Sequence, residues 1–118
     1  MNNVTLIGRV ANDIELKYGK TSETAITNFN LAVDKLFKKE GEDTADFIPV
    51  VCFGKTAEFA EKWFAKGMRI GVTGRLQSRK WKDADEKSHT VLEVLASGVE
   101  FADGKKNSFD SDGDDLPV

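Results

Sequence analysis

The sequence predicts an all-β domain with one helix, arranged as a small barrel of five strands. Three observations predict it: segments in which branched and aromatic residues alternate with polar ones, one segment whose apolar residues recur every four positions, and glycines inside a long strand-like segment. The connections between strand-like segments resemble hairpins, and no alternation of strand and helix calls for a parallel sheet. A length of 118 residues suits a single domain.

The first half of the chain contains three predicted strands. Residues 3–10, 25–33 and 47–53 are rich in branched and aromatic side chains. The polar stretch 34–46 joins the second strand to the third, and we interpret it as a long hairpin arm whose length favours a functional role. Pro49 cannot donate a ladder hydrogen bond, which predicts an edge or a bulge in the third strand.

The apolar period changes in residues 56–66. Phe59 and Trp63 lie four positions apart, which predicts one amphipathic helix with Trp63 in the core. Thr56 is the expected N-cap, and Gly67 is the expected left-handed residue that ends the helix.

Two more strands complete the predicted barrel. Residues 68–82 return to strand character, with Gly71 and Gly74 where a closed barrel needs to bend, and a charged turn leads to a last strand at 90–101. This order of elements fits a five-stranded oligonucleotide-binding (OB) fold. We therefore expect residues 1–101 to form the barrel and residues 102–118 to form a short, disordered tail.

The charge distribution separates tail from barrel. Residues 1–101 contain 15 Lys/Arg and 15 Asp/Glu, whereas residues 102–118 contain 2 and 5, so the net charge of −3 belongs to the tail. No apolar run approaches the roughly 20 residues that span a bilayer, and the N-terminus lacks a signal-peptide pattern, so we expect a cytoplasmic protein without membrane contact.

The residues that most catalytic and metal sites need are scarce. Cys52 is the single cysteine and His89 is the single histidine, which excludes an intrachain disulfide and a His-pair metal site. A Ser-His-Asp triad would have to be built around His89. We expect no metal, no cofactor and no enzymatic activity.

The most specific cluster is RLQSRKW at residues 75–81. A strand pleat places Arg75, Gln77, Arg79 and Trp81 on one face. Guanidinium groups can hold phosphates, and a base stacked on an aromatic ring contributes about 1–3 kcal/mol, so this face suits single-stranded nucleic acid. The alternative is a solvated strand with Trp81 folded onto the barrel end.

Three phenylalanines extend the candidate binding surface. Phe47 and Phe53 face the same side of an apolar strand, one side of which must meet bases or another subunit. Phe47 is the stacking candidate of the two, while Phe53 suits core and binding surface equally. Phe37 precedes Lys38 and Lys39 in the long arm, where stacking is easier to arrange than burial.

The segments FGKTAEFAEKWFAKG, GVTGRLQSRKW and NNVTLIGRV resemble the helix, fourth strand and first strand of bacterial-type single-stranded DNA-binding proteins. The resemblance covers about residues 1–101. It implies a non-catalytic homotetramer of OB barrels that coats single-stranded DNA during replication, recombination and repair, with little sequence preference. The implied stacking residues are Phe37, Phe47, Phe53 and Trp81, and the implied phosphate-binding residues include Lys55, Arg79 and Lys80, with Arg9 and Lys17 brought in by the same resemblance. Arg75, Lys38 and Lys39 are further phosphate-binding candidates because they lie beside the aromatic residues.

The chain departs from the family pattern at two places. Many members carry tryptophan where this chain has Phe37 and Phe47, which implies weaker stacking. The tail DSDGDDLPV resembles the acidic tip that recruits replication and recombination proteins, but Val118 replaces the usual final aromatic residue, so a purely solubilising tail stays open. Its near-absent linker favours a phage-encoded or specialised member. The partner-binding candidates in the tail are Asp112, Asp114, Asp115, Leu116, Pro117 and Val118.

Two other functions stay open at this level. One is an RNA-binding barrel of the cold-shock kind. The other is an assembly-only interaction module, whose apolar strand faces would only pair subunits. Binding of a single strand in a salt-dependent manner separates the predicted function from the assembly module.

Overall fold

The computed structural model describes residues 1–19, 24–37, 40–41 and 44–102. The predicted barrel of five strands with one helix is confirmed, and a short sixth strand, which the sequence did not predict, is added to it. The elements in chain order are β1 (Val4–Val10), β2 (Glu15–Tyr18), β3 (Ala25–Asp34), β4 (Ala45–Phe53), α1 (Gly54–Trp63), β5 (Arg69–Lys82) and β6 (Ser88–Phe101).

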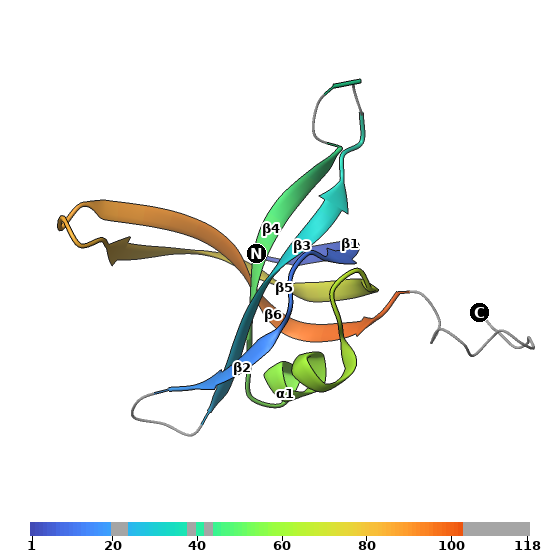
Figure 1. Cartoon of the computed structure of the whole chain (residues 1–118), viewed down its shortest axis with the longest axis horizontal. Helices are drawn as coiled ribbons and strands as arrows, with labels where there is room; N and C mark the ends of the chain where they lie inside the picture. Colours follow the sequence, from blue (N-terminus) through green and yellow to red (C-terminus); the bar gives the residue numbers. More distant parts are fainter. Residues whose placement is uncertain (20–23, 38–39, 42–43, 103–118) are drawn as a thin grey trace, which may run out of the picture.

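The sheet closes because β1 pairs on both of its sides. Val4 to Arg9 lie antiparallel to β5, and Arg9 and Val10 also pair with β3. The ring continues from β5 to β6, then by a short parallel contact to β4, and from β4 back to β3. Within the described part of the chain, the added strand β2 pairs with β3 alone, outside the ring (Figure 1).

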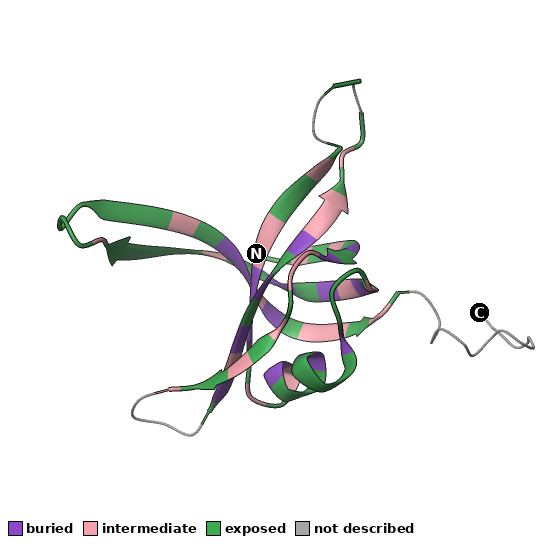
Figure 2. Cartoon of the chain, in the orientation of Figure 1, coloured by how far each residue is buried: buried purple, intermediate pink, exposed green. Residues whose placement is uncertain are grey.

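Two hairpins project from the barrel in different directions (Figure 1). One is formed by β3 and β4, and the other by β5 and β6. Buried residues gather where the strands cross, whereas the outer parts of both hairpins are mostly exposed (Figure 2). The outer parts of the β3–β4 and β5–β6 hairpins are therefore accessible to a ligand in solution.

The core combines β-branched and leucine side chains of the strands with small residues of the helix. Leu31, Ile70 and Val94 are almost fully buried, and Ala57 and Ala60 bring α1 close to the sheet. Burial also raises the pKa of the Cys52 thiol to about 12. The one helix among the described residues is not long and apolar enough to cross a membrane.

The helix limits differ from those predicted. α1 begins at Gly54 rather than Thr56, and its N-cap residue, Phe53, makes no side-chain capping hydrogen bond. The expected Thr56 cap is therefore wrong. The helix ends at Trp63, and Gly67, with φ +91°, lies in a turn four residues further on rather than at the helix end.

The prediction that Trp63 is a core residue is also wrong, since 48% of it is exposed. Ala57, Ala60 and Phe64 form the buried stripe of the segment, and Trp63 lies on the neighbouring stripe. The Lys62 ammonium lies 5.3 Å from its ring centre. A four-residue spacing identifies residues that share a stripe, but several stripes of this helix carry apolar residues.

Pro49 occupies an edge position, as predicted. It lies opposite Asn30 in the β3–β4 ladder. The Asn30 N–H donates to Asn12 Oδ1 at 2.8 Å, and its carbonyl accepts from the Ala11 N–H at 2.8 Å, so Asn30 directs both backbone groups away from β4. No ladder donor toward β3 is needed from Pro49, and on the other side of β4 the described pairing with β6 begins only at Val50.

Gly74 marks the bend of the long β5–β6 hairpin. The ladder shifts register between Thr73 and Gly74, leaving Ser97 as the extra residue of β6. A Cβ on Gly74 would lie 2.1 Å from the carbonyl oxygen of Leu95. Only glycine allows the two strands to approach this closely, which agrees with the expected bend.

Candidate functional site

The pleat of the sheet places the predicted binding residues on one outward surface. On β4, Val50 and Cys52 point into the core, so Val51 and Phe53 point outward. Val51 lies opposite Leu95 of β6, and Leu95 lies opposite Arg75 of β5. Residues opposite each other in a ladder share a face. The outward residues form what we call the outer face: Phe47, Pro49, Val51 and Phe53 of β4; His89, Val91, Glu93 and Leu95 of β6; Arg75, Gln77, Arg79 and Trp81 of β5.

All four predicted stacking rings are exposed. The exposed fractions are 82% for Phe37, 60% for Phe47, 43% for Phe53 and 44% for Trp81. For Phe53, the structure favours the surface over the core. Phe47 and Phe53 are six residues apart on β4, which corresponds to about 20 Å along the strand. The rings therefore spread over a long surface instead of gathering in one pocket.

Two further ladder rows bring cations to the same side of the sheet. Arg9 of β1 lies opposite Ala32 of β3, which lies opposite Phe47. Likewise, Lys17 of β2 lies opposite Ile26 of β3, which lies opposite Phe53. Because neighbouring strands are about 4.8 Å apart, each cation stands roughly 10 Å across the sheet from a ring. Arg9 and Lys17 are isolated cations in the sequence, but the pairing of the strands places them on the same side of the sheet as the outer face.

A buried carboxylate interrupts the outer face. Glu93 is only 3% exposed, although its strand neighbours on that face are not core residues. Gln77 Nε2 donates to Glu93 Oε2 at 2.8 Å, and Arg79 donates through Nε at 3.2 Å and Nη2 at 3.3 Å. Burial alone would raise the pKa of Glu93, but the hydrogen bonds from Arg79 and Gln77 outweigh it and hold the pKa below its ordinary value.

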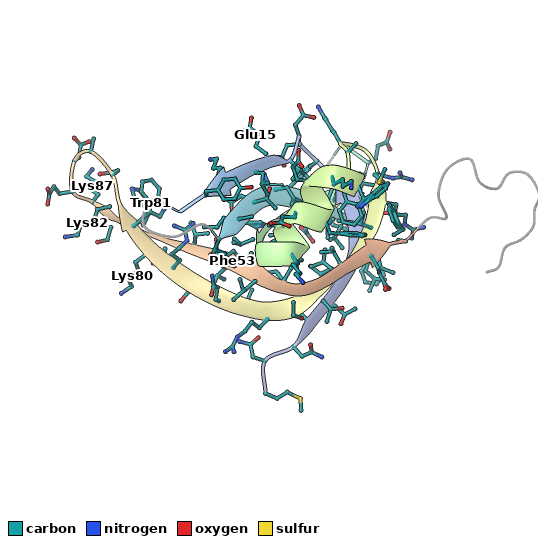
Figure 3. The ribbon with its side chains drawn as sticks, turned by 90° about the horizontal axis from the view of Figure 1, so that it is seen from below. Glu15, Phe53, Lys80, Trp81, Lys82 and Lys87 are labelled. Atoms are coloured by element: carbon teal, nitrogen blue, oxygen red, sulfur yellow. The ribbon has the colours of Figure 1, made fainter. Side chains whose placement is uncertain are left out.

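The ring of Trp81 has a partner that the sequence did not reveal. His89 lies directly opposite Trp81 in the ladder, and the two rings stack with centres 4.5 Å apart and planes 22° apart. His89 Nε2 lies 2.8 Å from Asp83 Oδ2. Trp81 and Lys80 extend to opposite sides of the hairpin (Figure 3), so Lys80 is not part of the outer face.

Arg9 stands in the row of Phe47, but its side chain also has a partner within the protein. Its Nη1 donates to the carbonyl of Gly67 at 2.9 Å, in the turn after α1. Lys55 is exposed in the first turn of α1, away from the sheet ladder. Lys38, Lys39 and the six tail candidates lie outside the described residues.

His89 and Glu93 are the polar outer-face residues that sequence reasoning did not place there. A usable signal existed in the turn: Trp81 and His89 both lie four residues from Asp85, and Gln77 and Glu93 both lie eight from it. Centring the hairpin on Asp85 would have paired them.

Chemically, exposed rings and cations over a long surface suit an extended polyanion that carries flat groups.

Comparison with known proteins agrees with this geometry. The sequence model of the "Single-strand binding protein family" matches residues 1–102. A "Single-stranded DNA-binding protein" of Clostridium tetani is 46% identical over 114 residues, which is 96% of this chain and 79% of the relative. "Single-stranded DNA-binding protein 2" of Clostridium acetobutylicum is 47% identical over 108 residues, covering 92% and 81%. A relative from Fusobacterium nucleatum is 42% identical over 111 residues, covering 92% and 71%.

Proposed function

Because the chain belongs to the single-strand binding protein family, we propose that it binds single-stranded DNA along its outer face, without catalysis and with little sequence preference. Bases stack on the exposed rings, and the cations beside them contact phosphates. Strands held in this way are kept from pairing with themselves and from nucleases during replication, recombination and repair.

The arrangement of rings and cations in shared ladder rows carries this proposal. Arg9 stands in the row of Phe47, Lys17 in the row of Phe53, and Arg75 joins the same surface through Leu95 and Val51. Since residues 1–101 carry no net charge, attraction to phosphates must come from this local placement rather than from an overall basic protein. Stacking is tolerant of sequence because every base has a flat face.

One titration tests the proposal. Oligo-dT is added to the full chain at about 50 and about 200 mM salt while tryptophan emission is followed. We expect quenching of Trp81 emission and tighter binding at the lower salt. The Phe47→Ala, Trp81→Ala double variant, followed through labelled oligo-dT because it lacks Trp81, should bind several-fold more weakly. Trp63→Phe, on the helix, should bind like the unchanged chain. Absence of salt-dependent binding would refute DNA binding and leave an assembly module.

Competition with matched RNA and with duplex DNA completes the test. If oligo-U displaces oligo-dT at equal concentration, the preference for DNA is wrong and an RNA-binding barrel fits better. Duplex DNA should compete poorly, because paired bases do not offer their faces to Phe47 or Trp81.

We further propose a homotetramer in the cytoplasm, of the cell itself or of a phage host, with the acidic residues 102–118 contacting replication or recombination proteins. The support is the family membership and the concentration of negative charge in the tail. Mass measurement in solution tests the oligomer, and deletion of residues 102–118 tests the tail. The deletion should abolish partner binding and, if the tail competes for the outer face, tighten oligo-dT binding at low salt.

A further inference from the structure

The stacked pair Trp81 and His89 is fixed at one end by the turn of the β5–β6 hairpin. The Asp83 carboxylate makes the link, because its two oxygens have different partners. Oδ1 accepts the backbone N–H groups of Asp85 at 2.9 Å and Lys87 at 3.0 Å, while Oδ2 lies 2.8 Å from His89 Nε2. The hydrogen bond with His89, followed by that from the Lys87 N–H, lowers the pKa of Asp83. The carboxylate therefore stays charged and in place.

The backbone of the turn reinforces this fixation. The Asp83 N–H donates to the Lys87 carbonyl at 3.1 Å, and the Glu86 N–H donates to the Asp83 carbonyl at 2.9 Å. These bonds hold Asp83, which holds the imidazole of His89, which lies against the indole of Trp81. Figure 3 shows Trp81 close to this end of the hairpin, near Lys82 and Lys87.

The indole thus packs against a neighbour within the protein itself. His89 covers one of its faces, yet 44% of Trp81 remains exposed, so the exposed area lies on the other face and along the ring edge. A freely rotating tryptophan would lose rotamer freedom when a base stacks on it, which costs affinity. A ring already held by His89 does not incur this cost again on binding.

We propose that His89, held by Asp83, is a positioning residue that presents the free face of Trp81 to a base of the bound strand. The inference rests on the proposed binding of single-stranded DNA and adds to it a role for the single histidine of the chain. His89 acts through Trp81, so its effect on binding must disappear when Trp81 is absent.

The test uses the full chain with Trp63→Phe, which leaves Trp81 as the only tryptophan. In that background, His89→Ala should lower the fluorescence anisotropy of Trp81 and weaken oligo-dT binding about 2- to 10-fold. His89→Phe, which retains a flat ring, should restore part of both. Ser88→Ala, a neighbouring change on the opposite face of β6, serves as the matched control and should alter neither.

The decisive comparison is His89→Ala on its own and together with Trp81→Ala, with affinity measured through fluorescently labelled oligo-dT because the Trp81→Ala chains contain no tryptophan. We expect no additional loss of affinity in the Trp81→Ala background. An equal loss in both backgrounds would mean that His89 contacts DNA itself, which overturns the positioning role. Unchanged affinity in His89→Ala also overturns it while the proposed function stands, whereas failure of the Trp63→Phe chain to bind oligo-dT at all overturns both.

Discussion

Arg79 on β5 holds the buried carboxylate of Glu93 on β6 with two of its nitrogens, one for each carboxylate oxygen. The pair lies on the outer face, where a negative charge by itself would repel phosphates. Arg79 therefore neutralises Glu93, and we expect its guanidinium also to contribute to the candidate binding surface. Its contribution to folding and its contribution to binding can be separated by experiment.

Arg79→Ala should lower the free energy of unfolding, because it removes the cation from the buried Glu93 carboxylate and leaves Gln77 as its hydrogen-bond partner among the described residues. In a Glu93→Gln background the same change should cost clearly less, since no buried charge is then left without its cation. Urea unfolding of the four proteins of this cycle measures the coupling. Equal costs in both backgrounds would show that the ion pair does not stabilise the hairpin.

The lowered pKa of Glu93 predicts a loss of stability in acid. In the unfolded chain this carboxyl takes up its proton at a higher pH than in the folded protein, so its contribution is complete above the unfolded pKa of about 4.3 and is lost as the pH falls through the folded pKa. Glu93→Gln should flatten the pH dependence of Tm below about pH 5. Identical Tm profiles for the two proteins would contradict this prediction.

Gly74→Ala should destabilise the barrel by about 2 kcal/mol or more, because the added methyl would overlap the Leu95 carbonyl oxygen, a backbone atom that cannot move aside easily. Gly98 is the matched control on the partner strand: no atom lies within 4 Å of the place its Cβ would take. Gly98→Ala should change the stability by less than about 1 kcal/mol. Thermal unfolding of both variants tests the contrast, and similar losses would refute the close-approach argument.

Glu86 has a positive φ of 65° in the turn of the β5–β6 hairpin, a conformation that glycine adopts without steric cost. Glu86→Gly should therefore raise the free energy of unfolding, by up to about 1 kcal/mol. Ala84→Gly, two residues earlier and without a positive φ, should lower it instead. Chemical denaturation distinguishes the two, and a loss of stability in Glu86→Gly would count against the argument.

Arg75→Ala should weaken oligo-dT binding and reduce the log–log salt slope by about 0.7, the amount expected for one phosphate contact on a single strand. Lys62→Ala removes the same charge from α1, away from the outer face, and should leave the slope unchanged. Titrations at several salt concentrations give both slopes. A comparable fall in the two variants would mean that the general charge of the protein, and not the outer face, determines binding.

The strands could be predicted because their signal is local. Alternation of apolar and polar residues located β1, β3, β4, β5 and β6 to within two residues at each end, while the four residues of β2 were too few to show a pattern. The helix limits could not be fixed, because α1 begins directly after Phe53 without a side-chain cap.

The candidate site was predictable only in part. Exposed rings and cations could be named from residue type and pleat, but their neighbours depend on register across strands. Glu93 is charged within an apolar run and gave no sign of burial, and its partners come from a different strand. The stack of His89 on Trp81 likewise depends on where the turn is centred.

The outer half of the β5–β6 hairpin could become longer without disturbing the barrel. Beyond Gln77 and Glu93 its two strands pair only with each other among the described residues, so their length is not tied to the barrel. Inserting two residues into each strand would extend the hairpin by about 7 Å and keep every ring on its present side. Inserting one residue into each would turn Trp81 away. Insertions of an even number of residues into each strand would therefore lengthen the surface that contacts a polymer while the fold stays the same.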